Sequence, residues 1–176
     1  MKREPGRKRT AAADGEKAER PPAFDRALRL LELRPHFARE VERKLERAGY
    51  EATEIETAVR RLAELGYLDD AAHAKSHAAT LGDRKGYGTT RIRAELVRRG
   101  ASSDSIAAAL AGGGGEADLV RAREAAAKWL RRGSKDRAAL ARHLGRRGFD
   151  RRAIFTVLKE LDSAPENTEG ESFADD

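Results

Sequence analysis

Two histidines, His73 and His77, stand four residues apart, a spacing that places both side chains on one face of a helix. Such a pair could share a metal ion, but zinc sites need three or four ligands and the sequence contains no cysteine. The adjacent Asp69 and Asp70 could form a carboxylate dyad, yet neighbouring residues at a helix start point in different directions, so they are better explained as helix caps. We therefore expect no metal, no cofactor and no enzymatic activity.

Two glycine-rich stretches could bind phosphate. Four consecutive glycines occupy 112–115, but no Lys-Ser or Lys-Thr pair follows them as in a phosphate-binding loop, so this stretch is better explained as a flexible link. Gly86 and Gly88 form a Gly-x-Gly turn ahead of a predicted helix N-terminus, where a phosphate could be held. A plain turn is the commoner role of such a stretch.

Trp129 is the single tryptophan of the chain and has Lys128, Arg131 and Arg132 around it. An exposed tryptophan beside arginine can stack on the bases of a single strand. The helical spacing of Trp129 from Ala125 favours a place in the core instead.

Charged residues are unevenly distributed along the chain. The 176 residues carry a net charge of +6, but 121–161 hold thirteen basic and four acidic residues, whereas 35–80 hold seven basic and nine acidic ones. The final 162–176 contain six acidic residues and no basic one. One end of the folded region is therefore strongly cationic, which indicates a polyanionic partner such as DNA, or an acidic protein surface. An arginine-rich solvated surface without a partner is the plainer alternative.

The elements that carry these residues are helices with a repeated ending. Leucine, three residues, glycine and usually an aromatic residue recur at 45–50, 62–67, 96–101 and 144–149. A glycine in the left-handed conformation just past a helix lets the next residue fold back onto the last turn. Each phrase thus predicts a helix end closed by an apolar contact, and Ala101 makes the third contact the weakest.

Three of these glycines, at 49, 100 and 148, mark copies of one unit. Positions −8, −4, +6 and +10 relative to each glycine are apolar in every copy, which makes one stripe on the helix before the glycine and one on the helix after it. A further amphipathic segment precedes each copy, at 24–33, 70–81 and 116–130. Units spaced about 50 residues apart indicate a tandem array.

The chain is therefore predicted to be all-α, with three tandem three-helix repeats and no strand. We expect a disordered basic tail at 1–22, repeats at 23–66, 67–111 and 116–161, the glycine link at 112–115, and a disordered acidic tail at 162–176. The expected helix caps are Asp69, Thr89 or Thr90, Ser102, Ser134 and Asp150. The basic N-terminus has no apolar stretch behind it, so we expect no signal peptide and no membrane segment, but a cytoplasmic monomer.

The motifs of these repeats resemble those of the RecX family of regulatory proteins. The resemblance lies in GYLDD at 66–70 followed by Ala74, in GYGTTRIRAEL at 86–96, and in 144–158 with its Arg147-Gly148-Phe149, and it covers about residues 24–161. The chain departs from the family at His73, where an aromatic residue is usual, and at Thr89, where proline is frequent.

The resemblance implies an elongated, curved array of three-helix units that modulates RecA, the recombinase that forms filaments on single-stranded DNA. RecX proteins bind in or along the groove of that filament and restrain its extension, ATP hydrolysis and strand exchange without enzymatic activity of their own. The expected partners are RecA, its filament and single-stranded DNA, with double-stranded DNA as a further candidate. The alternatives are a DNA-binding protein that acts without RecA and a repeat scaffold for an acidic protein.

Candidate contacts to these partners are basic residues near the helix ends. One cation in the last helical turn contributes about 0.3–1 kcal/mol through the helix dipole, which leaves the second arginine of the pairs at 98–99 and 146–147 available for a partner. The full candidate set is Lys85, Arg91, Arg93, Arg98, Arg99, Arg131, Arg132, Arg142, Arg146, Arg147, Arg151 and Arg152.

Overall fold

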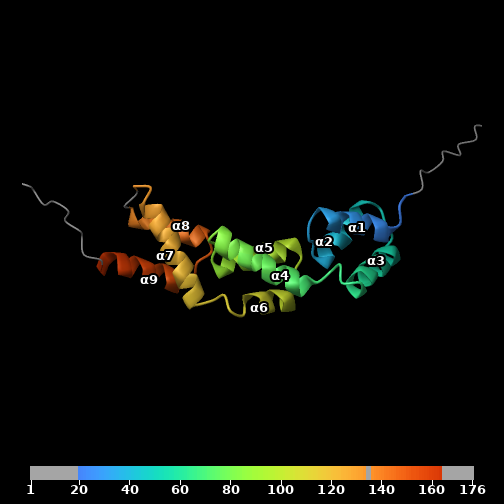
Figure 1. Cartoon of the computed structure of the whole chain (residues 1–176). Helices are drawn as coiled ribbons and strands as arrows, with labels where there is room; N and C mark the ends of the chain where they lie inside the picture. Colours follow the sequence, from blue (N-terminus) through green and yellow to red (C-terminus); the bar gives the residue numbers. More distant parts are fainter. Residues whose placement is uncertain (1–19, 134–135, 164–176) are drawn as a thin grey trace, which may run out of the picture.

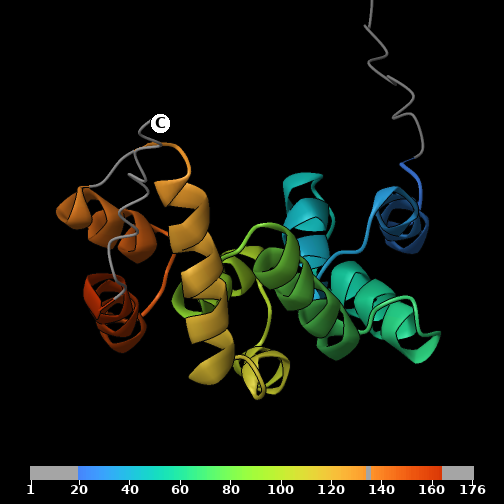
Figure 2. The ribbon, with the colours of Figure 1, turned by 60° about the vertical axis from the view of Figure 1, so that its left-hand side comes forward.

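The computed structural model describes residues 20–133 and 136–163, and every regular element in that part of the chain is helical. Three groups of helices follow one another along the long axis (Figure 1). Their bounds are α1 Ala23–Leu33, α2 Ala38–Arg47 and α3 Ala52–Glu64 in repeat 1; α4 Asp70–Ala79, the π-helical turn η1 Thr80–Arg84, α5 Thr89–Arg99 and α6 Ser103–Leu110 in repeat 2; and α7 Glu116–Leu130, α8 Arg137–Arg146 and α9 Arg151–Ser163 in repeat 3. The array is elongated and curved (Figure 2). The predicted all-α fold of three tandem three-helix repeats is confirmed, while the two expected tails lie largely outside the described residues.

Each repeat has its own apolar core, and the predicted stripes form it. The buried stripe residues are Val41, Leu45, Ile55, Ile92, Leu96, Ile106, Leu110, Leu140 and Leu144, with Val59, Ile154 and Leu158 partly buried beside them. Phe37, which immediately precedes α2, is buried in the core of repeat 2 rather than repeat 1. Its ring lies 4.4 Å from that of His73, centroid to centroid, so this histidine packs against a core residue of repeat 2.

The four predicted glycine stops all have positive φ, between 75° and 97°, as the left-handed helix ending requires. Tyr50 and Phe149 are buried behind their glycines, as expected. Tyr67 is not: its side chain is 55 % exposed and Leu68 is buried in its place. Both Tyr67 and Leu68 donate their backbone N–H to the carbonyl of Leu62, so at this end the chain closes its apolar contact one residue later.

Three of the predicted caps are confirmed and one is wrong. Asp69, Ser102 and Asp150 accept backbone N–H groups in the first turns of α4, α6 and α9. Neither Thr89 nor Thr90 caps α5; the helix begins after Gly88, and its first N–H is bound by a carboxylate from another repeat, described below. Ser134 lies outside the described residues, and Asp136 caps α8.

The glycine link between repeats 2 and 3 is held by hydrogen bonds. The carbonyl of Gly113 accepts from the Thr89 hydroxyl at 2.7 Å and from the Arg121 guanidinium at 2.9 Å. Repeat 3 also contacts repeat 2 directly, through backbone hydrogen bonds from Gly88 and Thr90 to its α8 end. Contacts both at the link and outside it therefore connect repeats 2 and 3, and the flexibility expected of the link stays a prediction.

Candidate nucleic-acid interface

The contact between repeats 2 and 3, called the second joint below, is built around the start of α5. The buried Asp118 of α7 accepts the Thr89 N–H with its two carboxylate oxygens, at 3.1 and 3.2 Å. Gly88 N–H donates to the carbonyl of Arg147 at 2.9 Å, and Thr90 N–H to that of Gly148 at 3.2 Å. An acidic side chain and two carbonyls of repeat 3 thus satisfy N–H groups that a helix start leaves without intrahelical partners.

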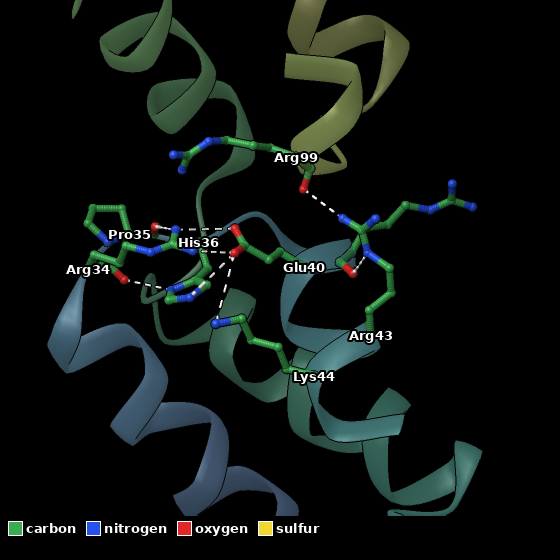
Figure 3. A network of polar contacts seen from close by, with 8 residues as sticks. Arg34, Pro35, His36, Glu40, Arg43, Lys44 and Arg99 are labelled. Carbon is green, nitrogen blue, oxygen red and sulfur yellow. Dashed lines mark hydrogen bonds and ion pairs between the residues drawn. The ribbon is translucent and has the colours of Figure 1, made fainter. Parts of the chain in front are cut away.

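The contact between repeats 1 and 2, the first joint, repeats this arrangement. Asp70 of α4 accepts the Ala38 N–H at the start of α2, at 2.9 Å. Gly100 packs on the first turn of α2, where an added Cβ would stand 2.9 Å from the Cβ of Arg39. Arg43 donates to the carbonyl of Arg99 at 2.9 Å (Figure 3). Asp70 and Asp118 thus play matching roles at the two joints, and so do Gly100 and Gly148.

Two of the candidate binding residues are engaged in the second joint. Arg147 donates to the carbonyls of Gly86 and Lys85, with a distance of 3.1 Å from its Nε to the Gly86 oxygen. Arg91 donates to the carbonyl of Arg146 at 2.8 Å, and its guanidinium lies 4.1 Å from the centroid of the Tyr87 ring. These two arginines hold repeats 2 and 3 together, a role that their positions in the sequence do not indicate.

The two arginines at the end of α5, Arg98 and Arg99, differ in exposure and in the residues they affect. Arg98 is exposed and pairs with Glu95 one turn earlier, at 2.6 Å. This hydrogen bond is the main reason that the pKa of Glu95 lies below its ordinary value. Arg99 is partly buried and lies near His77. Burial of His77 is the main reason that its pKa is lowered to about 4, and the charge of Arg99 is the next.

A cationic pocket lies at the second joint, on the side of α7 and the end of α8. The second-joint pocket has a volume of about 190 Å³ and is lined by Arg84, Lys85, Gly86, Arg121, Glu124, Ala125, Lys128, Trp129, Arg132, His143 and Arg147. It brings together three predicted residues: Lys85 from repeat 2, and Arg132 and Arg147 from repeat 3. Arg84, Arg121 and Lys128 were not predicted. For Arg121 and Lys128 the sequence did contain a signal, the helical spacing of 121, 128 and 132. This spacing places three cations on one face of α7 and the turn after it.

A second cationic hollow, the first-joint pocket, occupies the matching contact between repeats 1 and 2. It has a volume of about 240 Å³ and is lined by Arg34, Glu40, Arg43, Lys44, Arg47, Arg98 and Arg99. Only the last two were predicted as binding residues. Glu40 faces Arg34, His36 and Lys44 at its centre (Figure 3). One carboxylate therefore offsets part of the positive charge of this pocket.

His36 and Glu40 show how burial and charge act at the first joint. Burial lowers the pKa of His36 despite the opposing effect of its hydrogen bond with the carbonyl of Arg34. For Glu40, burial acts to raise the pKa, but the hydrogen bond from Arg34 and the charges of His36, Arg34 and Lys44 outweigh it, so the pKa is lowered. The pKa is thus lowered at both residues, by burial at His36 and by the neighbouring cations at Glu40.

The remaining candidate residues are exposed and line neither of the two joint pockets. They are Arg93, Arg131, Arg142, Arg146, Arg151 and Arg152. Arg142 lies 3.7 Å from Asp136, and Arg152 lines a separate hollow between α7 and α9. The structure therefore collects part of the predicted set at the joints and leaves the rest dispersed on the surface.

Trp129 lies between the core of repeat 3 and the second-joint pocket, so its expected place in the core holds in part and base stacking stays a prediction. Its ring is partly buried against the core of repeat 3, and it also lines the second-joint pocket, with its centroid 4.5 Å from that of His143.

His73 and His77 stack on each other with centroids 5.8 Å apart, and across the described residues no group of three or more His, Asp or Glu side chains is arranged to hold a metal. Within 20–133 and 136–163, no helix has the length and apolarity that a membrane span needs.

Comparisons with known proteins agree with the motifs. Residues 23–73 match the family model of the RecX first three-helix domain, and residues 69–110 match that of the RecX second three-helix domain. The regulatory protein RecX of Chlorobaculum tepidum is 38 % identical over 141 residues, which are 78 % of this chain and 86 % of the relative. That of Stenotrophomonas maltophilia is also 38 % identical, over 71 % of this chain and 78 % of the relative. The crystal structure of RecX from Lactobacillus salivarius superimposes with a TM-score of 0.72 at 23 % identity, covering 80 % of this chain and 94 % of that one.

Proposed function

Because the chain belongs to the RecX family of regulatory proteins, we propose that it binds RecA and the RecA filament on single-stranded DNA and restrains ATP hydrolysis, filament extension and strand exchange. It does so as a cytoplasmic monomer, by occupancy rather than by catalysis. The family resemblance described above supplies the link to RecA, and the charge and shape of this chain support it.

The observation that carries the proposal is the pair of cationic pockets at successive joints of an elongated array. α5 connects the two, since its N-terminal end forms the second joint and its C-terminal end forms the first. Its eleven residues place the two joints about 16 Å apart at 1.5 Å per residue. Such a row of positive sites suits a long polyanion, whose affinity depends on how many phosphates are neutralised at once.

The direct test is RecA ATP hydrolysis on single-stranded DNA with substoichiometric amounts of this protein. We expect hydrolysis to fall, and to fall less when Arg98 and Arg132, exposed residues that line the first-joint and second-joint pockets respectively, are both changed to glutamine. Arg26→Gln with Arg29→Gln, two exposed cations on α1, removes the same charge outside both pockets and serves as the control. An unchanged rate of hydrolysis at all protein concentrations would contradict the proposal.

A DNA-binding protein that acts without RecA is the second candidate, and the charge of repeat 3 favours it. The segment 121–161 carries nine net positive charges, enough to bind single-stranded DNA alone. Tight binding to single-stranded DNA, with no effect on RecA once free DNA is kept in excess, would support this alternative over the first.

A further inference from the structure

We propose that the second-joint pocket is a phosphate-binding site that receives the backbone of a single DNA strand. This inference deepens the proposed function and rests on it for the source of the phosphate, since the pocket chemistry itself specifies only the anion. The charge, the rigidity, the size and the walls of the pocket support it.

The charge of the pocket is positive and mostly uncompensated. Arg121 is the exception, because it pairs with the buried Asp118 at 2.5 Å. Arg84, Lys85, Lys128, Arg132 and Arg147 form no ion pair with any residue that the structure describes, and Glu124 is the single carboxylate in the lining. Five cations against one carboxylate leave a surplus that an anion would offset.

One of these cations is already fixed in position. Two carbonyl oxygens, of Gly86 and Lys85, hold the Arg147 guanidinium through its Nε and one Nη group. Carbonyls orient this side chain without cancelling its charge, and a guanidinium has further N–H groups that remain available. An anion that enters therefore meets a donor whose conformational entropy has already been lost, and planar guanidinium groups match the oxygens of a phosphate.

The size of the pocket argues against a whole nucleotide. Pockets for drug-sized ligands measure about 300–1,000 Å³, and this one measures about 190 Å³. A phosphate group fits, whereas its sugar and base must lie outside. A strand that passes over the joint meets this requirement.

The walls contain donors and a titratable group that respond to an anion. Arg121 Nε and Trp129 Nε1 are buried and have no acceptor among the described residues. The pKa of His143 is lowered by burial and then by the charges of Arg147, Arg146 and Arg132, which reports the positive field at this wall. Because Trp129 is the single tryptophan of the chain, tryptophan fluorescence reports on the surroundings of this pocket alone.

The first experiment follows the fluorescence of Trp129 in the full chain without RecA, while a short oligothymidylate is added. We expect a saturable change, and with it a rise in the pKa of His143 followed by NMR. An oligothymidylate with uncharged methylphosphonate links should cause no such change; an equal response would show that bases stack on Trp129 and would overturn the proposal. A response to inorganic phosphate alone, with none to the charged strand, would overturn the assignment to DNA.

Variants then test the cations. Lys128→Gln with Arg132→Gln should weaken oligothymidylate binding by about tenfold or more, because hydrogen bonds to charged groups are lost. Arg26→Gln with Arg29→Gln removes the same charge from exposed positions on α1, outside the pocket, and should change affinity by about threefold or less, since salt screens such distant charges. Equal losses in the two double variants would overturn the pocket and leave only diffuse attraction. Circular dichroism of both variants checks that the helices persist.

The two proposals fail in different ways. If RecA hydrolysis is unaffected by the wild-type protein but Trp129 still responds to the charged strand, the proposed function fails and the pocket stands. If hydrolysis falls for wild type and for the Lys128 and Arg132 double variant alike, and Trp129 does not respond to the strand, the pocket assignment fails and the proposed function stands.

Discussion

Gly148 of repeat 3 lies against Arg91 of repeat 2 so closely that a Cβ on the glycine would stand 2.3 Å from the Cβ of the arginine. The glycine also has a φ of 84°. Its position therefore carries two constraints: a left-handed helix ending, and a surface on which the first turn of α5 can rest. Gly100 meets the same two constraints against Arg39, with φ 97° and 2.9 Å.

These constraints can be separated by three alanine substitutions. Gly148→Ala should destabilise the protein by about 2–5 kcal/mol, from left-handed strain and steric overlap together. Gly66→Ala should cost about 1–2 kcal/mol, since Gly66 has φ 75° but nothing within 4 Å of an added Cβ. Gly145→Ala, on the open face of α8, should stabilise by about 0.5–1 kcal/mol. Urea unfolding measures all three, and a cost for Gly148→Ala no larger than that for Gly66→Ala would contradict the close contact.

Local spacing predicts the repeats because the forces that set them are local. The stripes around Leu45, Leu96 and Leu144 and the glycine stops depend on residues within two turns of each other, and they are confirmed. The caps of α2 and α5 were not predictable in this way, because Asp70 and Asp118 come from the next repeat. The local rule pointed to Thr89 instead, whose hydroxyl donates to the glycine link.

The binding residues were harder to predict than the fold. Counting charge identified repeat 3 as cationic, but a count does not reveal which arginines the protein uses for its own joints. Arg91 and Arg147 bind carbonyls across the second joint, whereas Arg146 is exposed. Only the three-dimensional contact separates them, since the arginines at 146 and 147 are adjacent in the chain.

Arg146 and Arg147 should therefore respond differently to substitution. Arg147→Gln should lower stability by about 1–3 kcal/mol, because it removes charge-assisted hydrogen bonds to the carbonyls of Gly86 and Lys85. Arg146→Gln should change stability by about 0.5 kcal/mol or less, as exposed charges usually do. Thermal unfolding compares the two, and it must accompany any binding assay on Arg147, because a weaker joint also lowers affinity. Equal stabilities would show that the carbonyl contacts contribute nothing.

Stability should fall as the pH is lowered from about 6.5 toward 4, because of His77. Burial, Arg99, His73 and Lys85 lower its pKa to about 4 in the folded protein, from an ordinary value of 6.5. Below pH 6.5 the unfolded chain therefore takes up a proton that the folded protein does not, which favours unfolding; above 6.5 the effect is constant. His36, His73 and His143 also have lowered pKa values and act in the same direction.

The measurement is the free energy of unfolding in urea at pH 7, 6 and 5. Most of this window lies above the range in which the carboxylates Glu40 and Glu95 titrate, since their pKa values in the folded protein are lowered from the ordinary 4.5. His77→Gln should make the decrease between pH 7 and 5 smaller than in the wild-type protein. A decrease of unchanged size would assign the acid sensitivity to the other three histidines.

The acidic segment at the C-terminus should compete with DNA for repeat 3. The segment 162–176 has six acidic residues, and the one whose side chain is described, Asp162, pairs with Arg137 of α8. Truncation after Leu161 should tighten binding to single-stranded DNA at about 0.01 M salt, where the Debye length is about 30 Å. The difference in affinity between the full-length and truncated chains should nearly vanish toward 1 M salt, where the Debye length is about 3 Å.

Fluorescence anisotropy of a labelled oligothymidylate measures both affinities. A full-length variant with all six acids, at 162, 166, 169, 171, 175 and 176, changed to their amides is the control for length, and it should match the truncation. Asp162→Asn alone should reproduce only the share due to the ion pair with Arg137. Equal affinity of the full-length and truncated chains at low salt would show that the acidic segment does not shield the cationic surface.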